Sequence, residues 1–238
     1  MTTSTRPPGA RVGVVVVAAG RGTRLGAGVP KAFVRLRGRP LLAYAADTLA
    51  RLSHQTSVVF VVPGDRVDRT HPDWAADWVE PPVTWLPDWV TLVAGGAERT
   101  DSVAAGLRAL PPECDIVLVH DAARCLTPVD VFARVIAAVA AGSSAVVPGI
   151  AVVDTIKVID DHGFVVSTPE RATLRAVQTP QGFARGALDA AHATGRAATD
   201  DAALAELIGI PVRVVAGDPL AAKVTTPDDL VAAQRLLA

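Results

Sequence analysis

The chain has 238 residues, of which 50% are hydrophobic, a formal net charge of −1 at pH 7 and only two cysteines. This length supports one sizeable core, and α/β chains of roughly this size commonly fold as a single unit, so we expect one domain over residues 1–238. A net charge near zero argues against bulk nucleic-acid binding. The lack of an apolar run of about 18 residues argues against a membrane span. The two cysteines have neither metal-ligand nor redox-motif spacing, which fits a cytoplasmic protein.

Residues 1–11 are polar and contain prolines, without the apolar stretch of a secretory signal, and we expect a short disordered lead. The apolar run that follows, residues 12–19, predicts a strand buried on both faces of a sheet. The run ends in a glycine-rich turn that contains Gly20, Gly22 and Gly26. Glycines let a backbone approach a ligand closely, and the N–H groups of such a turn can point at an anion.

The basic charge of the chain is concentrated around this turn. The first 46 residues carry eight Arg or Lys side chains and no Asp or Glu, and Arg21, Arg24 and Lys31 surround the glycines. This pattern predicts binding of a polyanionic small molecule, most simply a nucleoside triphosphate. The alternative is a purely structural turn, because glycine is common wherever a strand leads into a helix.

Two well-known phosphate-binding loops do not match the turn. The P-loop requires Gly-Lys-Ser/Thr after its second glycine, which is missing here. The dinucleotide fingerprint requires glycine where Leu25 stands, and an acidic residue about 20 positions further on. The first acidic residue after the turn is Asp47, within a helical pattern. A nicotinamide-dependent dehydrogenase is therefore disfavoured.

The following segments alternate between helix and strand patterns. Periodic apolar residues predict helices over 40–52, 101–110 and 127–141, and short apolar runs predict strands over 57–62, 90–93, 115–119 and 145–148. Thr127, followed by Pro128, has the features of a helix N-cap. The alternation is typical of an α/β fold of the Rossmann-like type, with a mostly parallel twisted sheet and helices on both faces.

Two segments depart from this alternation. Residues 65–89 are rich in proline and tryptophan, and we expect a packed surface lobe rather than a stacking platform there. Residues 152–178 contain short β-like pieces, which predict a protruding antiparallel arm that pairs with a second copy of the chain. After the arm, the patterns predict helices over 183–193 and 200–208, a strand over 212–215, and a last helix capped by Thr226.

The residues that follow the predicted strands are candidates for a functional site, because ligands of open α/β sheets bind outside the carboxyl ends of the strands. They are Gly20, Gly22, Arg24, Lys31, Gly95, Gly96, Arg99, Ser102, Asp121 and Arg124, with Thr155, Lys157 and Arg171 from the arm, and Lys223. Glycines, cations and one carboxylate on a shared rim are the parts of a phosphoryl- or nucleotidyl-transfer site. Asp121 could help to hold Mg²⁺, and its alternative role is an ordinary helix or turn cap.

Several motifs resemble a known family. Ala18-Ala-Gly20-Arg-Gly22-Thr-Arg24 followed by Pro30-Lys31 resembles the opening signature of nucleotidyltransferases with a Rossmann-like fold. Further motifs follow in order and begin at Gly95, Val119, Asp154, Gln178, Thr199 and Lys223. Together, these motifs resemble the 2-C-methyl-D-erythritol 4-phosphate cytidylyltransferases of non-mevalonate isoprenoid biosynthesis.

The resemblance implies that CTP donates its cytidylyl group to 2-C-methyl-D-erythritol 4-phosphate and that pyrophosphate is released, with Mg²⁺ bound to the nucleotide. It implies that Arg24, Lys31, Arg171 and Lys223 are catalytic, with Arg24 and Lys31 stabilising charge on the α-phosphate and pyrophosphate. The implied CTP site is Ala18, Ala19, Gly20, Gly22, Gly96, Ser102 and Asp121. The implied acceptor site is Thr155, Arg171, Thr179, Thr199 and Lys223, with the arm residues crossing to the neighbouring subunit of a homodimer.

The sequence departs from the family pattern at one position, and three alternative functions are considered. Cys125 stands where the family usually has proline, which is expected to loosen the loop backbone but removes no charge. The closest alternative function is cytidylyl transfer to another polyol phosphate, such as ribitol 5-phosphate. A non-catalytic nucleotide-binding protein is a more distant one, and it would be expected to lack Arg24, Lys31 or Lys223. The dehydrogenase fails on the fingerprint.

Overall fold

The computed structural model describes residues 9–20, 22, 25–52, 56–68 and 86–237. Arg21, Arg24, Trp74, Trp78 and Trp85 lie outside these ranges, as does most of the expected N-terminal lead. The roles predicted for these residues therefore remain predictions. Trp89, the last tryptophan of the expected surface lobe, is described and is 45% exposed.

The centre of the molecule is an eight-stranded mixed sheet, which confirms the predicted α/β class. Its strand order is β10-β7-β11-β6-β1-β4-β5, with β12 also paired to β7. The strands are β1 (Val12–Val17), β4 (Thr56–Val62), β5 (Val90–Ala94), β6 (Ile116–Asp121), β7 (Ala145–Ala151), β10 (Arg175–Val177), β11 (Gln181–Ala184) and β12 (Val212–Ala216). The pairs β1–β4, β1–β6, β4–β5 and β7–β12 are parallel.

Strand β1 lies where the order of the sheet reverses. The chain passes from β1 to β4 and β5 on one side, and then returns to β6 on the other side of β1. In the register of this pair, Val17 at the end of β1 lies opposite Asp121 at the end of β6. The reversal point of an open α/β sheet is where ligands usually bind, so the fold brings the glycine-rich turn and Asp121 to the same edge.

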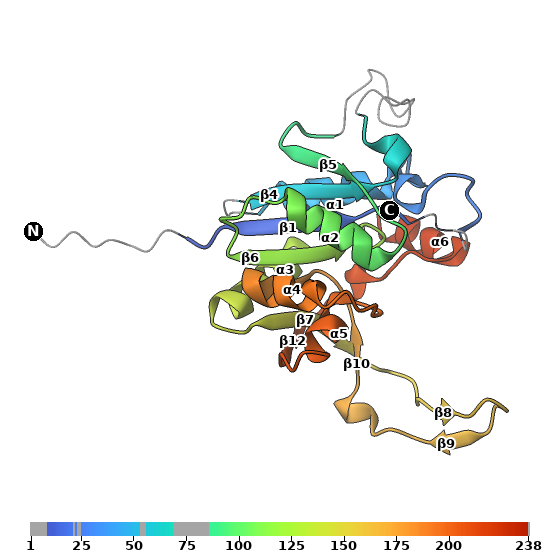
Figure 1. Ribbon diagram of the computed structural model, residues 1–238. Helices are drawn as coiled ribbons and strands as arrows, with labels where there is room; N and C mark the ends of the chain where they lie inside the picture. The colour runs from blue at the N-terminus through green and yellow to red at the C-terminus, as the bar shows by residue number, and fades with distance from the viewer. Residues whose placement is uncertain (1–8, 21, 23–24, 53–55, 69–85, 238) are drawn as a thin grey trace, which may run out of the picture.

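Helices cover both faces of the sheet (Figure 1). Helices α1 (Leu41–Leu49) and α3 (Val129–Ala140) contribute to one apolar cluster, and α2 (Arg99–Ala109), α4 (Arg185–Ala193) and α5 (Asp201–Glu206) contribute to the other. Alternate valines of β1 enter the two clusters: Val14 and Val16 the first, Val15 the second. A strand buried on both faces explains why β1 is continuously apolar.

The last helix, α6 (Pro227–Leu236), begins as predicted at Thr226. The hydroxyl of Thr226 accepts a hydrogen bond from the backbone N–H of Asp229, and the carboxylate of Asp229 accepts one from the N–H of Thr226, which forms a capping box. Near α6, the short strands β2 (Arg35–Leu36) and β3 (Arg39–Pro40) pair as a small hairpin. No helix among the described residues is long and apolar enough to cross a membrane.

Two local predictions are wrong. Residues 183 and 184 end strand β11 rather than starting a helix, because β11 pairs antiparallel with both β6 and β7 and the helix begins only at Arg185. Thr127 is not the N-cap of α3: its hydroxyl donates to the carbonyl of Arg124 at 2.7 Å, and Pro128 occupies the cap position without a side-chain hydrogen bond. In both cases, a contact with residues outside the predicted helix decides the local structure.

Residues 152–174 leave the body of the molecule as an arm (Figure 1). At its tip, β8 (Val158–Ile159) pairs antiparallel with β9 (Val165–Ser167). The third β-like piece expected in the arm instead returns to the main sheet as β10, antiparallel to β7. Large apolar side chains are exposed along the arm, with Val153 81%, Phe164 72% and Val166 66% exposed.

Candidate active site

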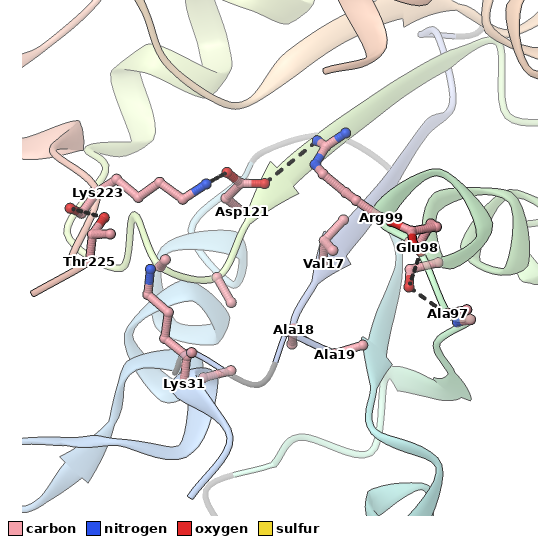
Figure 2. A pocket seen from close by; sticks show the side chains of 17 residues that line it. Val17, Ala18, Ala19, Lys31, Ala97, Glu98, Arg99, Asp121, Lys223 and Thr225 are labelled. Carbon is pink, nitrogen blue, oxygen red and sulfur yellow. Dashed lines mark hydrogen bonds and ion pairs between the residues drawn. The ribbon is translucent and has the colours of Figure 1, made fainter. Parts of the chain in front are cut away.

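A cleft of about 320 Å³ opens at the carboxyl ends of β1, β5 and β6 (Figure 2). Its lining comes from four segments that are distant in sequence. These residues are Val17, Ala18, Ala19, Gly20, Gly22, Lys31, Ala32, Gly96, Ala97, Glu98, Arg99, Ser102, Asp121, Ala122, Ala123, Lys223 and Thr225. In this view Lys31 and Lys223 lie on one side and Arg99 on the other, with Asp121 between them.

The first wall of the cleft is the glycine-rich turn after β1. The backbone N–H of Lys31 donates to the carbonyl of Gly20 at 3.3 Å, which closes the turn. Gly22 has a φ of +65°, and a Cβ atom at this position would collide with the Cβ of Lys31. Glycine is therefore required here both for the left-handed backbone and for the close approach. The packing fixes Lys31 beside the turn.

The opposite wall is the β5–α2 connection. A Cβ atom on Gly95 would collide with the Cβ of Ala19, so the absence of a side chain lets the two walls approach. The hydroxyl of Ser102 accepts from the N–H of Gly96 at 3.2 Å and donates to the carbonyl of Glu98 at 3.1 Å. Glu98 also caps α2 in a capping box with Asp101. Ser102 thus holds the loop backbone in place.

Asp121 is the ionised group at the centre of the cleft. Its Oδ2 atom lies 2.7 Å from Nζ of Lys223, and its Oδ1 atom lies 3.5 Å from a guanidinium nitrogen of Arg99. Burial alone would raise the pKa of this carboxyl, but the two cations outweigh burial and lower the pKa to about 2. Asp121 is therefore negative at any pH near neutrality.

A buried pair of side chains lies behind Asp121. The hydroxyl of Thr179 accepts from the backbone N–H of Asp121 at 3.0 Å and lies 3.0 Å from Nδ1 of His120. His120 is 1% exposed and packs against the ring of Phe132. Burial lowers the pKa of His120 to about 4, so the ring is neutral near pH 7. This pair fixes the end of β6, and with it the backbone of Asp121.

Arg124 joins the cleft floor to the segment that carries Lys223. One of its nitrogens donates to the carbonyl of Ala221 at 2.7 Å and another to the carbonyl of Val177 at 3.3 Å. Next to it, Cys125 is buried in an apolar cluster that includes Val224. Burial raises the pKa of the Cys125 thiol to about 12, so this side chain acts as an apolar packing group where the resembling family usually has proline.

The cleft brings together nine of the residues proposed from the sequence. They are Ala18, Ala19, Gly20, Gly22, Lys31, Gly96, Ser102, Asp121 and Lys223. Four others lie away from its lining: Thr155 and Arg171 are exposed on the arm, Thr199 is exposed before α5, and Thr179 is buried behind Asp121. Their substrate-binding roles remain predictions, as does the catalytic role of Arg24, which lies outside the described residues.

Sequence reasoning placed Arg99 on the rim without giving it a role, and it did not single out Glu98, Ala97 or Thr225. The signal for Arg99 was its position just after a predicted strand, beside Gly95 and Gly96. Its guanidinium reaches Asp121, while burial and nearby carboxylates act on it in opposite directions, with a net rise in its pKa. The cleft therefore combines backbone N–H groups, three cations and the carboxylates of Glu98 and Asp121. The charge of Asp121 is already paired with Lys223 and Arg99, so the cleft suits a polyanion.

Comparison with known proteins gives a consistent result. The family model of 2-C-methyl-D-erythritol 4-phosphate cytidylyltransferases matches residues 12–238. A protein of that name from Nocardia farcinica is 50% identical over 225 residues, covering 94% of this chain and 92% of the relative. A bifunctional IspD/IspF enzyme of Clavibacter michiganensis is also 50% identical, over 97% of this chain but only 55% of its own length.

Solved structures give the same result. The crystal structure of 2-C-methyl-D-erythritol 4-phosphate cytidylyltransferase from Thermus thermophilus is 34% identical, with a TM-score of 0.73. The match covers 95% of this chain and 98% of that structure. The match therefore spans nearly the whole of both chains.

Proposed function

The chain belongs to the 2-C-methyl-D-erythritol 4-phosphate cytidylyltransferase family, and on that basis we propose that its cleft transfers the cytidylyl group of CTP to 2-C-methyl-D-erythritol 4-phosphate. The products are 4-diphosphocytidyl-2-C-methyl-D-erythritol and pyrophosphate, in non-mevalonate isoprenoid biosynthesis. The observation that carries the proposal is that Lys31, Asp121 and Lys223, from three distant segments, line one cleft beside the glycine-rich turn.

The reaction needs little covalent participation from the protein. A phosphate oxygen of the acceptor attacks the α-phosphorus of CTP, a new P–O bond forms, and the bond to the bridging oxygen breaks. Its electron pair leaves on pyrophosphate. Negative charge builds on the α-phosphate oxygens and on the leaving group, so preorganised cations accelerate the step. Lys31 and Arg24 would supply this stabilisation, and Lys223 would contact a substrate phosphate.

The nucleotide would occupy the two walls of the cleft. The turn from Ala18 to Gly22 offers backbone N–H groups to phosphates. The opposite wall, at Gly96 and Ser102, would hold the nucleoside. Asp121 lines the same cleft, at the end of the strand that pairs with β1.

Asp121 also fits the metal ion that the family resemblance implies. It is an ionised carboxylate at the cleft, and Mg²⁺ prefers oxygen ligands, commonly one or two carboxylates together with substrate phosphates. Asp121 would hold Mg²⁺ jointly with the phosphates of CTP. When bound, the ion neutralises part of the phosphate charge.

The arm supports assembly of a homodimer. Its exposed apolar side chains, Val153, Phe164 and Val166 among them, would be covered by a second copy. Thr155 and Arg171 lie on the same arm, away from the cleft of their own chain. In a symmetric dimer they would reach the acceptor in the cleft of the partner. Action in the cytoplasm is supported by the two cysteines, which are free and buried.

A test of the crossed arm is complementation between two inactive variants. A mixed dimer of Lys31→Ala and Arg171→Ala chains would contain one site with both substitutions and one site with neither. If the arm crosses, random reassembly of equal amounts should restore about a quarter of the native activity, because half of the dimers each carry one intact site. Mixing would restore nothing if Arg171 served the cleft of its own chain. Affinity capture of one tagged variant, followed by detection of the other, confirms that the mixed chains exchange.

The acceptor is tested directly by pyrophosphate release. With CTP and Mg²⁺, we expect the chain to release pyrophosphate with 2-C-methyl-D-erythritol 4-phosphate at a kcat/KM at least about tenfold above that with ribitol 5-phosphate, because polar groups matched to one acceptor are left unpaired by another. Faster turnover with ribitol 5-phosphate would reassign the acceptor. No release with either acceptor, and no binding of CTP, would contradict the proposed function.

A further inference from the structure

A row of five side chains joined by ion pairs and hydrogen bonds runs from the cleft into the body of the molecule. Lys223 contacts Oδ2 of Asp121 at 2.7 Å, and Oδ1 of Asp121 lies 3.5 Å from Arg99. Arg99 in turn contacts Oδ2 of Asp201 at 2.8 Å, and Oδ1 of Asp201 lies 2.9 Å from Nε2 of His192. Figure 2 shows the cleft end of this row. Asp121 thus has two cationic partners.

The two partners of Asp121 differ in how firmly they are held. The side chain of Lys223 is 42% exposed, that of Arg99 is 27% exposed, and that of Asp201 is fully buried. Asp201 is the first residue of α5, whose start is fixed because Asp200 caps the helix and Gln181 bonds to Asp200. Arg99 is therefore held in place by the buried carboxylate of Asp201, whereas the more exposed side chain of Lys223 is freer to move.

His192 holds the far oxygen of Asp201. Its Nδ1 atom is buried and has no hydrogen-bond partner in the described part of the chain. A proton on Nδ1 would be a buried donor without an acceptor, which costs free energy, so the neutral ring carries its proton on Nε2. That N–H donates to Asp201 at 2.9 Å. His192 and Arg99 together satisfy both oxygens of this buried carboxylate.

The arrangement matters when a substrate phosphate enters the cleft. For Lys223 to contact the phosphate, its ammonium must leave Asp121 or share its hydrogen bonds. Unless Mg²⁺ is already bound beside it, a largely buried carboxylate that lost its only cation would be strongly destabilised. Arg99 removes this obstacle, because its contact with Asp201 keeps its positive charge beside Asp121.

We propose that Arg99, anchored by Asp201 and His192, is the permanent counter-ion of Asp121, so that Lys223 can exchange Asp121 for a substrate phosphate. The inference rests on the proposed function for the phosphate-binding role of Lys223. Arg99, Asp201 and His192 are positioning residues in this scheme, since they act through Asp121.

The test uses the lysine signals of the full chain. The sequence contains only Lys31, Lys157 and Lys223, so NMR of protein labelled at the lysine ε-carbon gives three signals, which single Lys→Arg variants assign. CTP is titrated in as the probe, with inorganic pyrophosphate in a second series. We expect the Lys223 signal of the native chain to shift on addition of either.

The decisive variant is Arg99→Met combined with Asp201→Asn, which removes both members of the Arg99–Asp201 ion pair. Removing both avoids leaving the buried carboxylate of Asp201 without its cation. Lys223 is then the only cation on Asp121, and its signal should require about tenfold more CTP for half-saturation. The matched control is Arg39→Met with Asp47→Asn, which removes an ion pair of the same 2.8 Å length outside the cleft lining. This control should titrate like the native chain.

Kinetics separate positioning from a general structural effect. In an Asp121→Asn background, removing the Arg99–Asp201 pair should change kcat/KM by less than about twofold, since the charge that Arg99 balances is already gone. His192→Gln, which keeps an N–H donor, should retain more CTP affinity than His192→Leu. A melting temperature close to that of the native chain would show that the fold of each variant is intact.

Three outcomes would overturn the inference. A Lys223 response unchanged by loss of the Arg99–Asp201 pair contradicts this inference but not the proposed function, as does an equal kinetic loss with and without the Asp121 charge. A native chain whose Lys223 signal ignores both CTP and pyrophosphate contradicts the proposed function, and this inference with it.

Discussion

Lys31→Ala should lower kcat by about 10²–10³-fold, because removing one preorganised donor to transition-state charge typically costs about 2.7–4 kcal/mol. Lys31 lines the cleft, and its Cβ packs against the backbone of Gly22 in the turn. The ammonium is thus attached to the turn that we propose to receive the phosphates. Since charge grows on the α-phosphate and pyrophosphate only as the bond exchanges, the loss should fall mainly in kcat rather than in the KM for CTP.

The measurement is steady-state pyrophosphate release at saturating acceptor. Arg35→Ala is a suitable control, because Arg35 belongs to the same basic segment but is exposed and does not line the cleft. This control should keep kcat within about twofold of native, as surface substitutions usually have small effects. A Lys31→Ala enzyme with native kcat and a raised KM for CTP would assign Lys31 to ground-state binding instead.

Acidification from pH 7 to pH 4 should remove about 3 kcal/mol of folding stability through His120 alone. The buried ring has a pKa of about 4 in the folded protein against 6.5 for the free side chain. The unfolded chain therefore binds a proton between these values while the folded chain does not. The stabilising contribution is complete above pH 6.5 and is lost as the pH falls toward 4.

Urea unfolding at several pH values from 7 to 4 measures this effect. His120→Gln can still accept a hydrogen bond from Thr179 but does not titrate, so its free energy of unfolding should fall about 3 kcal/mol less than that of the native chain over the same range. His162→Gln, on the exposed arm, should retain the native pH dependence. Parallel pH curves for native and His120→Gln protein would show that His120 is not the titrating group.

The family and the chemistry of the site followed from residues that act locally. The apolar run of β1 and the glycines after it require a buried strand and a close-approach turn wherever they occur. Lys31, Asp121 and Lys223 were found because each follows a predicted strand, and parallel strands end at the same edge of a sheet. The capping pattern at Thr226 was also sufficient to predict where the last helix begins, since a cap bonds only to its own helix.

The sequence failed where long-range contacts outweigh local preference. Residues 181–184 have a pattern too short to separate strand from helix, and pairing with β6 and β7 on both sides made them β11. The hydroxyl of Thr179 lies between His120 and the backbone of Asp121, a contact that the sequence did not indicate, and its role at the acceptor stays a prediction.

What the sequence determined by itself is the alternation of strands and helices, the glycine-rich turn and the identity of the charged groups near it. Only the tertiary structure decided how those groups pair. Arg99 and Asp201 are 102 positions apart, and so are Asp121 and Lys223. No periodicity or motif spacing links such residues, because hydrogen bonds and ion pairs depend on distances of about 3 Å that exist only once the sheet and its helices have packed.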